Sequence, residues 1–365
     1  MFKTSITEIL AEVEKINPVE YGRTRNFLDG AVTRLSPYIS RGAISSKYVL
    51  NSLLKKGYKF YEYERFAQEL AWREYFQNVW AAAKDEIDDD LKQMQTDVKN
   101  SLMPKALIDA TTGIEAIDKG INDLYETGYV HNHLRMYIAA TACNIGKSHW
   151  RVPAKWMYFH LLDADWASNS LSWQWTAGTF SSKKYYANQD NINKFCATDQ
   201  QRTFLDVDYT ELDELPIPEV LRETENPILT TELPKKEPLE IDSSLPTLVY
   251  NFYNLDPFWK PDIQANRILL FEPSHFEKYP VSSKTIDFVL KLAENIGGIK
   301  IYSGEFDELI SGYNLSEIYF REHPTNRNYK GTEEPRDWMF PEIRNYYPSF
   351  FGYWRKCEKL LKARK

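Results

Sequence analysis

The sequence predicts a mainly α-helical protein: a helical domain over residues 1–205, followed by a small α/β domain with a short parallel sheet over residues 247–365. Three observations lead to this fold class. Apolar residues recur at three- and four-residue steps through most of the first 205 residues, which is the helical period. Residues 206–246 hold six of the eighteen prolines and an acidic excess, as is typical of a linker. After Pro246, short apolar runs alternate with a helical segment, as in βαβ units.

The bulk composition indicates a globular protein rather than a membrane or disulfide-rich one. The chain has 365 residues, 43% of them hydrophobic, which is enough for two domains with cores. It contains neither an uninterrupted apolar run of membrane-spanning length nor a cleavable apolar leader, so we expect a cytoplasmic protein without a membrane partner. The three cysteines are odd in number and far apart, so we expect buried or free thiols.

Charge is unevenly distributed along the chain. The formal net charge is −7, but residues 206–242 alone hold twelve acidic and three basic residues. The rest of the chain therefore has a slightly positive balance. This permits a local basic face for nucleic acid without demonstrating one.

The first elements are a short amphipathic helix over residues 4–16 and a loop-rich segment over residues 21–45. This segment contains glycine, proline, serine and four arginines close together. A loop rich in hydroxyls and backbone amides that leads into a helix suits a phosphate group. An ordinary capped helix start explains the same composition equally well.

A long helix is predicted from Tyr61 to Ala83. Phe66, Glu69, Arg73 and Phe76 recur at helical steps, with Trp72 beside them. A surface ion pair would explain Glu69 and Arg73, which are four residues apart. It would not explain why they share a stripe with two phenylalanines.

Between this helix and the central stretch, the prediction is less regular. Residues 85–109 are charged and predict a loop with a short helix. Residues 111–127 predict a helix that ends at Gly128 as its C-cap.

The stretch from Gly128 to Trp175 carries polar residues on helical faces. Two sets share a face, namely Asn132, Arg135 and Met136, and Trp166, Asn169 and Trp173. Such groups are costly in a helix interface unless they have partners. Arg135 and the Asp163/Asp165 pair could neutralise one another, which would leave several donors and acceptors unused. A large, polar, planar ligand between the helices would account for those.

The C-terminal part reads as strands and one crossover helix. Residues 247–253, 267–272, 299–303 and 316–320 predict short strands, and residues 283–296 predict a helix that ends at Gly297 and Gly298. The aromatic tail from Trp338 is expected to pack back onto one of the domains. The linker is expected to be partly ordered by its leucine, isoleucine and valine residues.

A metal site is not predicted. His131 and His133 are separated by one residue and therefore point apart on a helix, and no cysteine or carboxylate completes the set at helical spacing.

Three motifs in this order resemble the flavin-binding helical domain of the photolyase/cryptochrome family: H-N-H-L-R-M from His131, D-A-D-W-A-S-N from Asp163 and W-Q-W from Trp173. The resemblance runs from Tyr21 to Phe195. It implies a photolyase-like all-helical fold for residues 1–205, with FAD as the cofactor. In front of this domain the family normally has an α/β antenna domain. Here an α/β unit follows instead, which suggests a shortened, relocated antenna-like domain or a small unrelated module.

The resemblance implies a set of cofactor-binding residues. The family's phosphate-binding element T-S-x-L-S reads V-T-R-L-S here, so its first hydroxyl is lost. We still expect phosphate binding, because backbone amides do not depend on the side chain. The implied cofactor-binding residues are Tyr21, Thr33, Arg34, Leu35, Ser36, Phe66, Arg73, Asn132, Arg135, Asp163, Ala164, Asp165 and Asn169.

The resemblance also implies catalytic roles for Trp173, Trp150, Asn169 and Glu69. Asn169 matches the residue that faces flavin N5 in photolyases, and Arg135 with Asp163 would stabilise a reduced, anionic flavin. Trp173 and Trp150 match the proximal and middle members of the family's tryptophan chain. The distal member is absent, since no tryptophan lies between Trp80 and Trp150. The electron route then ends at a tyrosine or uses another aromatic residue.

UV-damaged DNA is the implied partner, bound by a monomer. By the base-flipping logic, a damaged base pair enters a pocket of aromatic and apolar side chains with a few polar contacts. The implied DNA-contacting residues are Arg25, Glu69, Trp72, Asn132, His133, Met136, Trp175 and Gln189. His131 followed by Asn132 favours cyclobutane dimers, whereas L-L-D-A-D-W is more typical of the 6-4 and animal cryptochrome branch, so the lesion type stays open.

The functional prediction is therefore an FAD-dependent DNA photolyase that repairs pyrimidine dimers by light-driven electron transfer. The alternative is a cryptochrome-like blue-light photoreceptor that binds FAD without repair. A third hypothesis is a protein that retains flavin binding but has only a structural role.

Overall fold

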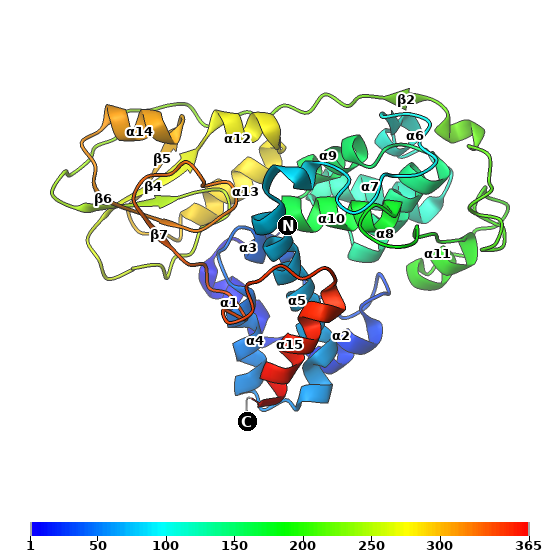
Figure 1. The fold of residues 1–365 in the computed structure, drawn as a ribbon, viewed down its shortest axis with the longest axis horizontal. Helices are drawn as coiled ribbons and strands as arrows, with labels where there is room; N and C mark the ends of the chain where they lie inside the picture. The colour runs from blue at the N-terminus through cyan, green and yellow to red at the C-terminus, as the bar shows by residue number, and fades with distance from the viewer. Residues whose placement is uncertain (1, 364–365) are drawn as a thin grey trace. The chain divides into compact units, whose positions relative to one another are not determined.

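A computed structural model describes residues 2–363 of the chain. The chain divides into two compact units that alternate along the sequence. Unit 1 comprises Met1–Pro18, Thr33–Ala82 and Thr230–Lys365, and unit 2 comprises Val19–Val32 and Ala83–Leu229. Helices predominate, and unit 1 also holds a five-stranded parallel sheet, so the predicted fold class is confirmed (Figure 1). The domain boundaries after residues 205 and 246 stay predictions.

The sheet of unit 1 has the strand order β5-β4-β3-β6-β7, with every neighbouring pair parallel. The chain starts in the middle of the sheet, adds two strands on one side and then returns to add two on the other. This reversal between β3 and β6 is the point at which open parallel sheets form a crevice for ligands. The strands are β3 (Pro246–Tyr250), β4 (Asn266–Phe271), β5 (Ile299–Ser303), β6 (Ser316–Arg321) and β7 (Thr332–Glu334).

Four of these strands coincide with the predicted runs, and the fifth was not predicted. Strand β7 is the polar tripeptide T-E-E, which carries no apolar signal and pairs only with the end of β6. Strand β3 ends earlier than its apolar run because residues 251–254 form a turn in which the amide of Asn254 donates to the carbonyl of Asn251 at 3.0 Å. Three helices connect the strands: α12 (Pro273–Lys278), α13 (Ser283–Ala293) and α14 (Phe306–Gly312). Only α13 is long enough to have been predicted.

One face of the sheet packs against α14 through a buried apolar cluster. Because side chains alternate along a strand, Val249 on β3 and Ile268 and Leu270 on β4 point to this face. The full cluster is Val249, Ile268, Leu270, Tyr302, Phe306, Leu309 and Phe320. Strands β3 and β4 are buried almost throughout, as is expected when both faces of a parallel sheet are covered.

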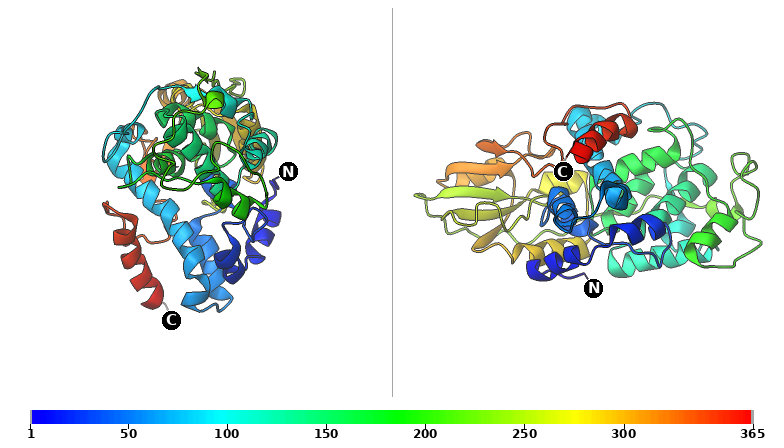
Figure 2. Two further views of the ribbon diagram at one scale, coloured as in Figure 1. Left: turned by 90° about the vertical axis from the view of Figure 1, so that its right-hand side faces the viewer. Right: turned by 90° about the horizontal axis from the view of Figure 1, so that it is seen from below.

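The helical part of unit 1 contains the long helix α5 and the C-terminal helix α15, which pack together (Figure 2). The ring of Phe350 stacks on Trp72 with centroids 3.6 Å apart, and Tyr353 lies 5.8 Å from Tyr75. The predicted return of the aromatic tail onto the body of the protein is therefore confirmed. The helices of this part are α1 (Ile6–Glu14), α3 (Ser36–Ser40), α4 (Ser46–Lys55), α5 (Phe60–Ala83) and α15 (Phe350–Ala363).

Unit 2 is helical apart from one two-residue strand pair. At its centre, helix α10 (Trp166–Ala177) packs against α9 (Arg151–His160) and η2 (Thr141–Ile145). The side-chain amide of Asn169 on α10 donates to the carbonyl of Ala154 on α9 at 2.8 Å, and that of Asn144 on η2 donates to the carbonyl of Thr176 on α10 at 3.0 Å. The elements are α2 (Pro18–Thr24), η1 (Lys84–Asp88), β1 (Met103–Pro104), α6 (Lys105–Ile108), α7 (Glu115–Thr127), α8 (Asn132–Ala140), η2 (Thr141–Ile145), α9 (Arg151–His160), α10 (Trp166–Ala177), α11 (Gln189–Cys196), η3 (Glu219–Leu221) and β2 (Thr224–Glu225).

Helix α7 begins later than predicted, for a local reason. The carboxylate of Asp118 accepts hydrogen bonds from the amides of Thr112 and Gly113, at 2.8 and 3.0 Å, which holds these residues in a turn before the helix. The predicted end is confirmed: Gly128 has φ +71°, the left-handed conformation of a C-cap. Alanine would not fit there, because its Cβ would lie 2.6 Å from Cγ of Leu162.

The proline-rich segment is partly ordered. Strand β2 pairs antiparallel with β1, so that Thr224 and Glu225 lie opposite Pro104 and Met103. Leu212 and Leu221 are buried, as expected for a segment held by its apolar residues.

Candidate functional site

The polar face of α8 begins directly after a helix cap. The ring nitrogen Nδ1 of His131 accepts a hydrogen bond from the amide of His133 at 3.1 Å, which starts the helix at Asn132. Asn132 is exposed, and Arg135 and Met136 are partly exposed. These three residues share one face of α8, as the spacing predicts, and that face is open to solvent.

An ion pair connects this face to the loop before α10. Nη2 of Arg135 lies 3.0 Å from Oδ2 of Asp163, and Nε of Arg135 donates to the carbonyl of Val130 at 2.9 Å. The Asp163 side chain is only 7% exposed, whereas that of Arg135 is 20% exposed. A buried carboxylate therefore fixes a guanidinium group that still reaches the surface. Among the described residues, the third nitrogen of Arg135, Nη1, has no hydrogen-bond partner.

The remaining residues of the D-A-D-W-A-S-N motif build the start of α10. Asp165 is its N-cap, and Oδ1 accepts the amide of Ser168 at 2.8 Å. Ala164 is fully buried. Asn169 uses its side-chain nitrogen to bond the carbonyl of Ala154, which orients its amide and leaves the oxygen as the other polar end. Of the two predicted acidic partners, only Asp163 forms an ion pair with Arg135.

The predicted electron-route tryptophans are buried in unit 2. Trp150 is 0% exposed and Trp173 is 2% exposed. The indole N–H of Trp150 donates to Oδ1 of Asp90 at 2.7 Å. A second tryptophan, Trp166, has an equivalent bond of 2.7 Å to Oδ1 of Asp88.

Two of the predicted DNA-contacting residues in unit 2 differ in solvent exposure: Trp175 is exposed and Gln189 is buried. Trp175 is 37% exposed and its ring lies 5.7 Å from that of Tyr185. Gln189 is 1% exposed, and both ends of its amide are bonded, to Asn193 at 2.9 Å and to Thr203 at 2.7 Å. This burial disfavours a DNA contact through the Gln189 side chain, whose DNA-binding role stays a prediction.

His133 is also engaged inside unit 2. Its Nδ1 lies 2.9 Å from the carbonyl oxygen of Asn26, and its ring packs 4.7 Å from those of Tyr137 and Phe195. Burial lowers the pKa of His133. The lowered pKa favours the neutral imidazole of His133, which disfavours a charged phosphate contact through it.

Tyr21 and Arg25 lie one helical turn apart at the end of α2. The amide of Arg25 donates to the carbonyl of Tyr21 at 2.9 Å, and both side chains are partly exposed. They are the remaining predicted site residues of unit 2.

The predicted phosphate-binding residues Thr33, Arg34, Leu35 and Ser36 belong to unit 1, where they lead into α3. Arg34 has φ +53°, an unusual conformation for a residue other than glycine. Leu35 is buried and precedes the first helical residue, Ser36. The predicted arrangement of a loop followed by a helix is confirmed, and its phosphate-binding role stays a prediction.

Helix α5 carries the other predicted residues of unit 1. Phe66 is buried, and Glu69, Trp72 and Arg73 are partly exposed. The Phe350 ring covers one face of the Trp72 ring. Sequence reasoning did not anticipate this contact, because the two residues are far apart in the chain.

The next residue on α5, Glu74, was missed as a site of interest. Its carboxylate accepts the amides of Met339 and Phe340, at 2.7 and 2.9 Å, and the hydroxyl of Tyr353 at 3.1 Å. Burial raises its pKa. Its position four residues after the buried Leu70 was the available signal, since a carboxyl group on an apolar stripe needs partners.

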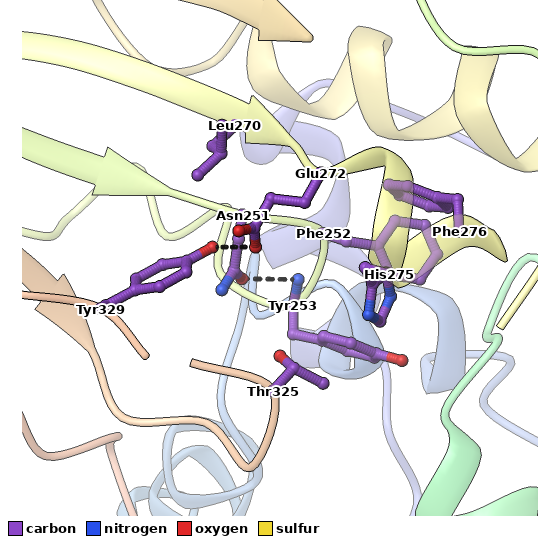
Figure 3. A pocket seen from close by; sticks show the side chains of 9 residues that line it. All are labelled: Asn251, Phe252, Tyr253, Leu270, Glu272, His275, Phe276, Thr325 and Tyr329. Carbon is purple, nitrogen blue, oxygen red and sulfur yellow. Dashed lines mark hydrogen bonds between the residues drawn. The ribbon is translucent and has the colours of Figure 1, made fainter. Parts of the chain in front are cut away.

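A second polar site lies at the carboxyl edge of the sheet, beside the reversal between β3 and β6 (Figure 3). The hydroxyl of Tyr329 donates to Oε2 of Glu272 at 2.5 Å, and the amide of Tyr253 donates to Oδ1 of Asn251 at 2.9 Å. Burial raises the pKa of Glu272 and lowers that of His275 to about 3. The loop after β3 reads N-F-Y-N, without the glycines of a dinucleotide-binding turn.

The described residues contain no cluster of side chains that could bind a metal ion. Nowhere in residues 2–363 do three or more histidine, cysteine, aspartate or glutamate side chains gather as a metal site would require. The same part of the chain has no helix that is long and apolar enough to span a membrane.

The comparisons with known proteins concern the helical part. Residues 66–246 match the family model described as the FAD-binding domain of DNA photolyase. A deoxyribodipyrimidine photo-lyase of Alkalihalophilus pseudofirmus is 28% identical over 188 residues, covering 50% of this chain and 39% of that protein. One of Agrobacterium fabrum is 32% identical over 157 residues, covering 41% of this chain and 32% of that protein. The chain therefore matches less than half the length of either relative.

A crystal structure of a Synechocystis cryptochrome has a TM-score of 0.46 and 20% sequence identity to this chain, covering 53% of this chain and 44% of the cryptochrome.

Proposed function

Because this chain carries the FAD-binding domain of the photolyase/cryptochrome family, we propose that it is a DNA photolyase that binds FAD and repairs UV-induced pyrimidine dimers by light-driven electron transfer. The observation that carries the proposal is the Arg135–Asp163 ion pair. Removing one member of such a pair leaves a buried charge without a partner, so the pair fixes the guanidinium position. Nη1 of Arg135 can still donate to a further acceptor, such as a ligand. An ion pair with a purely structural role would not need this spare donor.

The polar groups of unit 2 suit the edge of a flavin ring, which carries carbonyl oxygens and ring nitrogens. Nη1 of Arg135 and the amide of Asn132 supply donors, and the oxygen of Asn169 supplies an acceptor. Bound FAD would supply the light-driven electron that splits the dimer. Asp163 would hold Arg135 in the orientation that favours a negatively charged ring, and Trp150 and Trp173 would offer an electron route.

Met136 and Trp175 of unit 2 would contact a flipped lesion, and the family resemblance gives the same role to Glu69 and Trp72 of unit 1. The exposure of Trp175 and Met136 supports this role, because a stacking surface has to be reachable from solvent. Trp72 is the exception among the four, since its ring already has a stacking partner.

The first test is the absorption spectrum of the purified protein, followed by blue light with a reductant and oligonucleotides that carry either a cyclobutane dimer or a 6-4 product. Loss of either lesion supports the proposal. Arg135→Ala should lose bound flavin, whereas Lys119→Ala, which breaks an exposed ion pair with Asp123, should retain it. A preparation that contains no flavin and cannot be loaded with FAD would overturn the proposal.

The second candidate is a cryptochrome-like photoreceptor, and the Trp72–Phe350 stack favours it. A residue of the same chain occupies the face on which a damaged base would stack. In a photoreceptor the tail would be an output element, and lesion binding would be unnecessary. Flavin that is photoreduced without repair of either lesion would support this reading.

Phe350→Leu separates the two candidates. The substitution removes a stack worth about 0.5–1.5 kcal/mol while keeping an apolar side chain. If Trp72 receives lesions, affinity for a dimer-containing oligonucleotide should rise about 2- to 10-fold, as measured by fluorescence anisotropy. Phe351→Leu is the control, because Phe351 is 65% exposed. Unchanged affinity in Phe350→Leu would count against a lesion site at Trp72.

A further inference from the structure

The indole N–H of Trp150 is held by a carboxylate inside unit 2. It donates to Oδ1 of Asp90 at 2.7 Å, within the range of a charge-assisted bond. The surroundings fix both partners: Oδ2 of Asp90 accepts the amide of Gln95 at 2.8 Å, and the side-chain oxygen of Gln95 accepts the amide of Trp150 at 2.9 Å. Nε2 of His149 lies 3.4 Å from Oδ1 of Asp90.

We propose that Asp90 is the proton acceptor for Trp150 when this tryptophan is oxidised. The inference rests on the proposed function, because the electron acceptor would be FAD in its oxidised form under light, with Trp173 between it and Trp150. Trp150 gives one electron to the oxidised Trp173. Its indole N–H bond then breaks, and the proton forms an O–H bond on Asp90. A neutral tryptophan radical and a neutral carboxylic acid result, and a soluble thiol or other one-electron reductant later returns the electron while the proton moves back.

The burial of Trp150 is the reason that such an acceptor is needed. An indole that has lost an electron is far more acidic than a neutral indole, and a residue that is 0% exposed has no solvent to take its proton. No tryptophan lies between Trp80 and Trp150, where the family resemblance would place the third member of the electron route. Proton loss to Asp90 would hinder return of the electron, because the neutral radical must first be reprotonated. Proton loss to Asp90 would thus slow the return of the electron to Trp150, even though the electron route has only two tryptophans, Trp173 and Trp150.

Asp88, two residues before Asp90, provides a matched control for the role of Asp90. Asp88 accepts the indole N–H of Trp166 at the same distance of 2.7 Å, but Trp166 does not match a member of the electron route. If these bonds served only to pin residues 88–90 to the neighbouring helices, the two aspartates would be equivalent. If Asp90 accepts a proton, only its substitution should change the chemistry of Trp150.

Asp90→Asn tests the assignment, because the amide oxygen still accepts a hydrogen bond but is too weak a base to take the proton. Transient absorption after a light flash on the FAD-loaded protein distinguishes the tryptophan radical cation from the neutral radical. In the native protein the neutral radical should form with a solvent isotope effect. In Asp90→Asn its formation should slow by about 10²-fold, a typical loss for general-base catalysis. Asp90→Glu should restore it in part, and Asp88→Asn should behave as the native protein.

A readout that needs neither flavin nor its photochemistry complements this experiment. Ultraviolet resonance Raman spectra report the indole N–H bond, and the Trp150 contribution follows from subtraction of a Trp150→Phe spectrum. That contribution should shift in Asp90→Asn and remain in Asp88→Asn. A tryptophan radical that stays cationic in the native protein, or an equal effect of Asp88→Asn, would overturn the role of Asp90. Photoreduction that is unaffected by Trp150→Phe would instead refute the electron route itself, and with it that part of the proposed function.

Discussion

Asp163 in unit 2 and Glu74 in unit 1 are buried to a similar degree, at 7% and 5% exposed, but their partners differ. Asp163 pairs with the partly exposed guanidinium of Arg135. Glu74 accepts two backbone amides and a tyrosine hydroxyl. A buried carboxyl group whose acceptors are taken by backbone amides stabilises the fold. A buried carboxyl group that orients a partly exposed guanidinium leaves that cation able to bind a ligand. Burial alone would have ranked them as equals, so the identity of the partners carries the functional information.

The largest expected effect concerns Glu74. Glu74→Ala leaves the amides of Met339 and Phe340 without their acceptor, and each unsatisfied buried group costs about 1–3 kcal/mol. We expect the free energy of unfolding in urea to fall by about 3 kcal/mol. Glu74→Gln keeps an acceptor oxygen and should lose less. A cost within error of zero for Glu74→Ala would show that the tail is held without this carboxyl group.

Asp163→Ala should have a smaller effect on stability and a larger one on the cofactor. We expect a loss of about 2 kcal/mol, below the usual cost of breaking a buried pair because Arg135 is partly hydrated. Asp123→Ala breaks the exposed pair with Lys119 and should cost less than about 0.5 kcal/mol. Flavin content per chain, measured from the absorption spectrum, should fall only in Asp163→Ala. Equal flavin content in the two variants would remove the distinction between Asp163 and Glu74.

Sequence periodicity predicted the elements on both sides of this comparison but not all of their contacts. The helical spacing of Asn132, Arg135 and Met136 predicted a shared face, and charge complementarity predicted that Arg135 would find an aspartate. It could not choose between Asp163 and Asp165, because that choice depends on which of them caps α10. The partners of Glu74 lie 265 or more residues away, so no local pattern links them.

Side chains whose roles came only from motif resemblance were the least secure. Gln189 was assigned to DNA, yet its amide bonds Asn193 and Thr203 inside unit 2. Trp72 was assigned to an open pocket, yet Phe350 covers one face of its ring. In both cases the missing information was tertiary burial, which neither composition nor spacing specifies. Asp90 shows the converse, because only the fold revealed that an acidic loop residue meets Trp150.

The smallest expected effect is the pH dependence that Glu74 alone contributes. Burial raises its pKa above the ordinary glutamate value of 4.5, so the folded protein binds this proton more tightly than the unfolded chain does. The stabilisation from the protonated group is fully present below pH 4.5 and is lost as pH rises through the folded-state pKa. Other carboxyl groups titrate over the same range, so the difference between the native protein and Glu74→Gln isolates this contribution. The stability advantage of the native protein over Glu74→Gln should therefore shrink as pH increases, measured by urea unfolding at several pH values. A difference that grew with pH would mean that the amides of Met339 and Phe340 stabilise the carboxylate more than burial penalises it, which would make Glu74 resemble Asp163 after all.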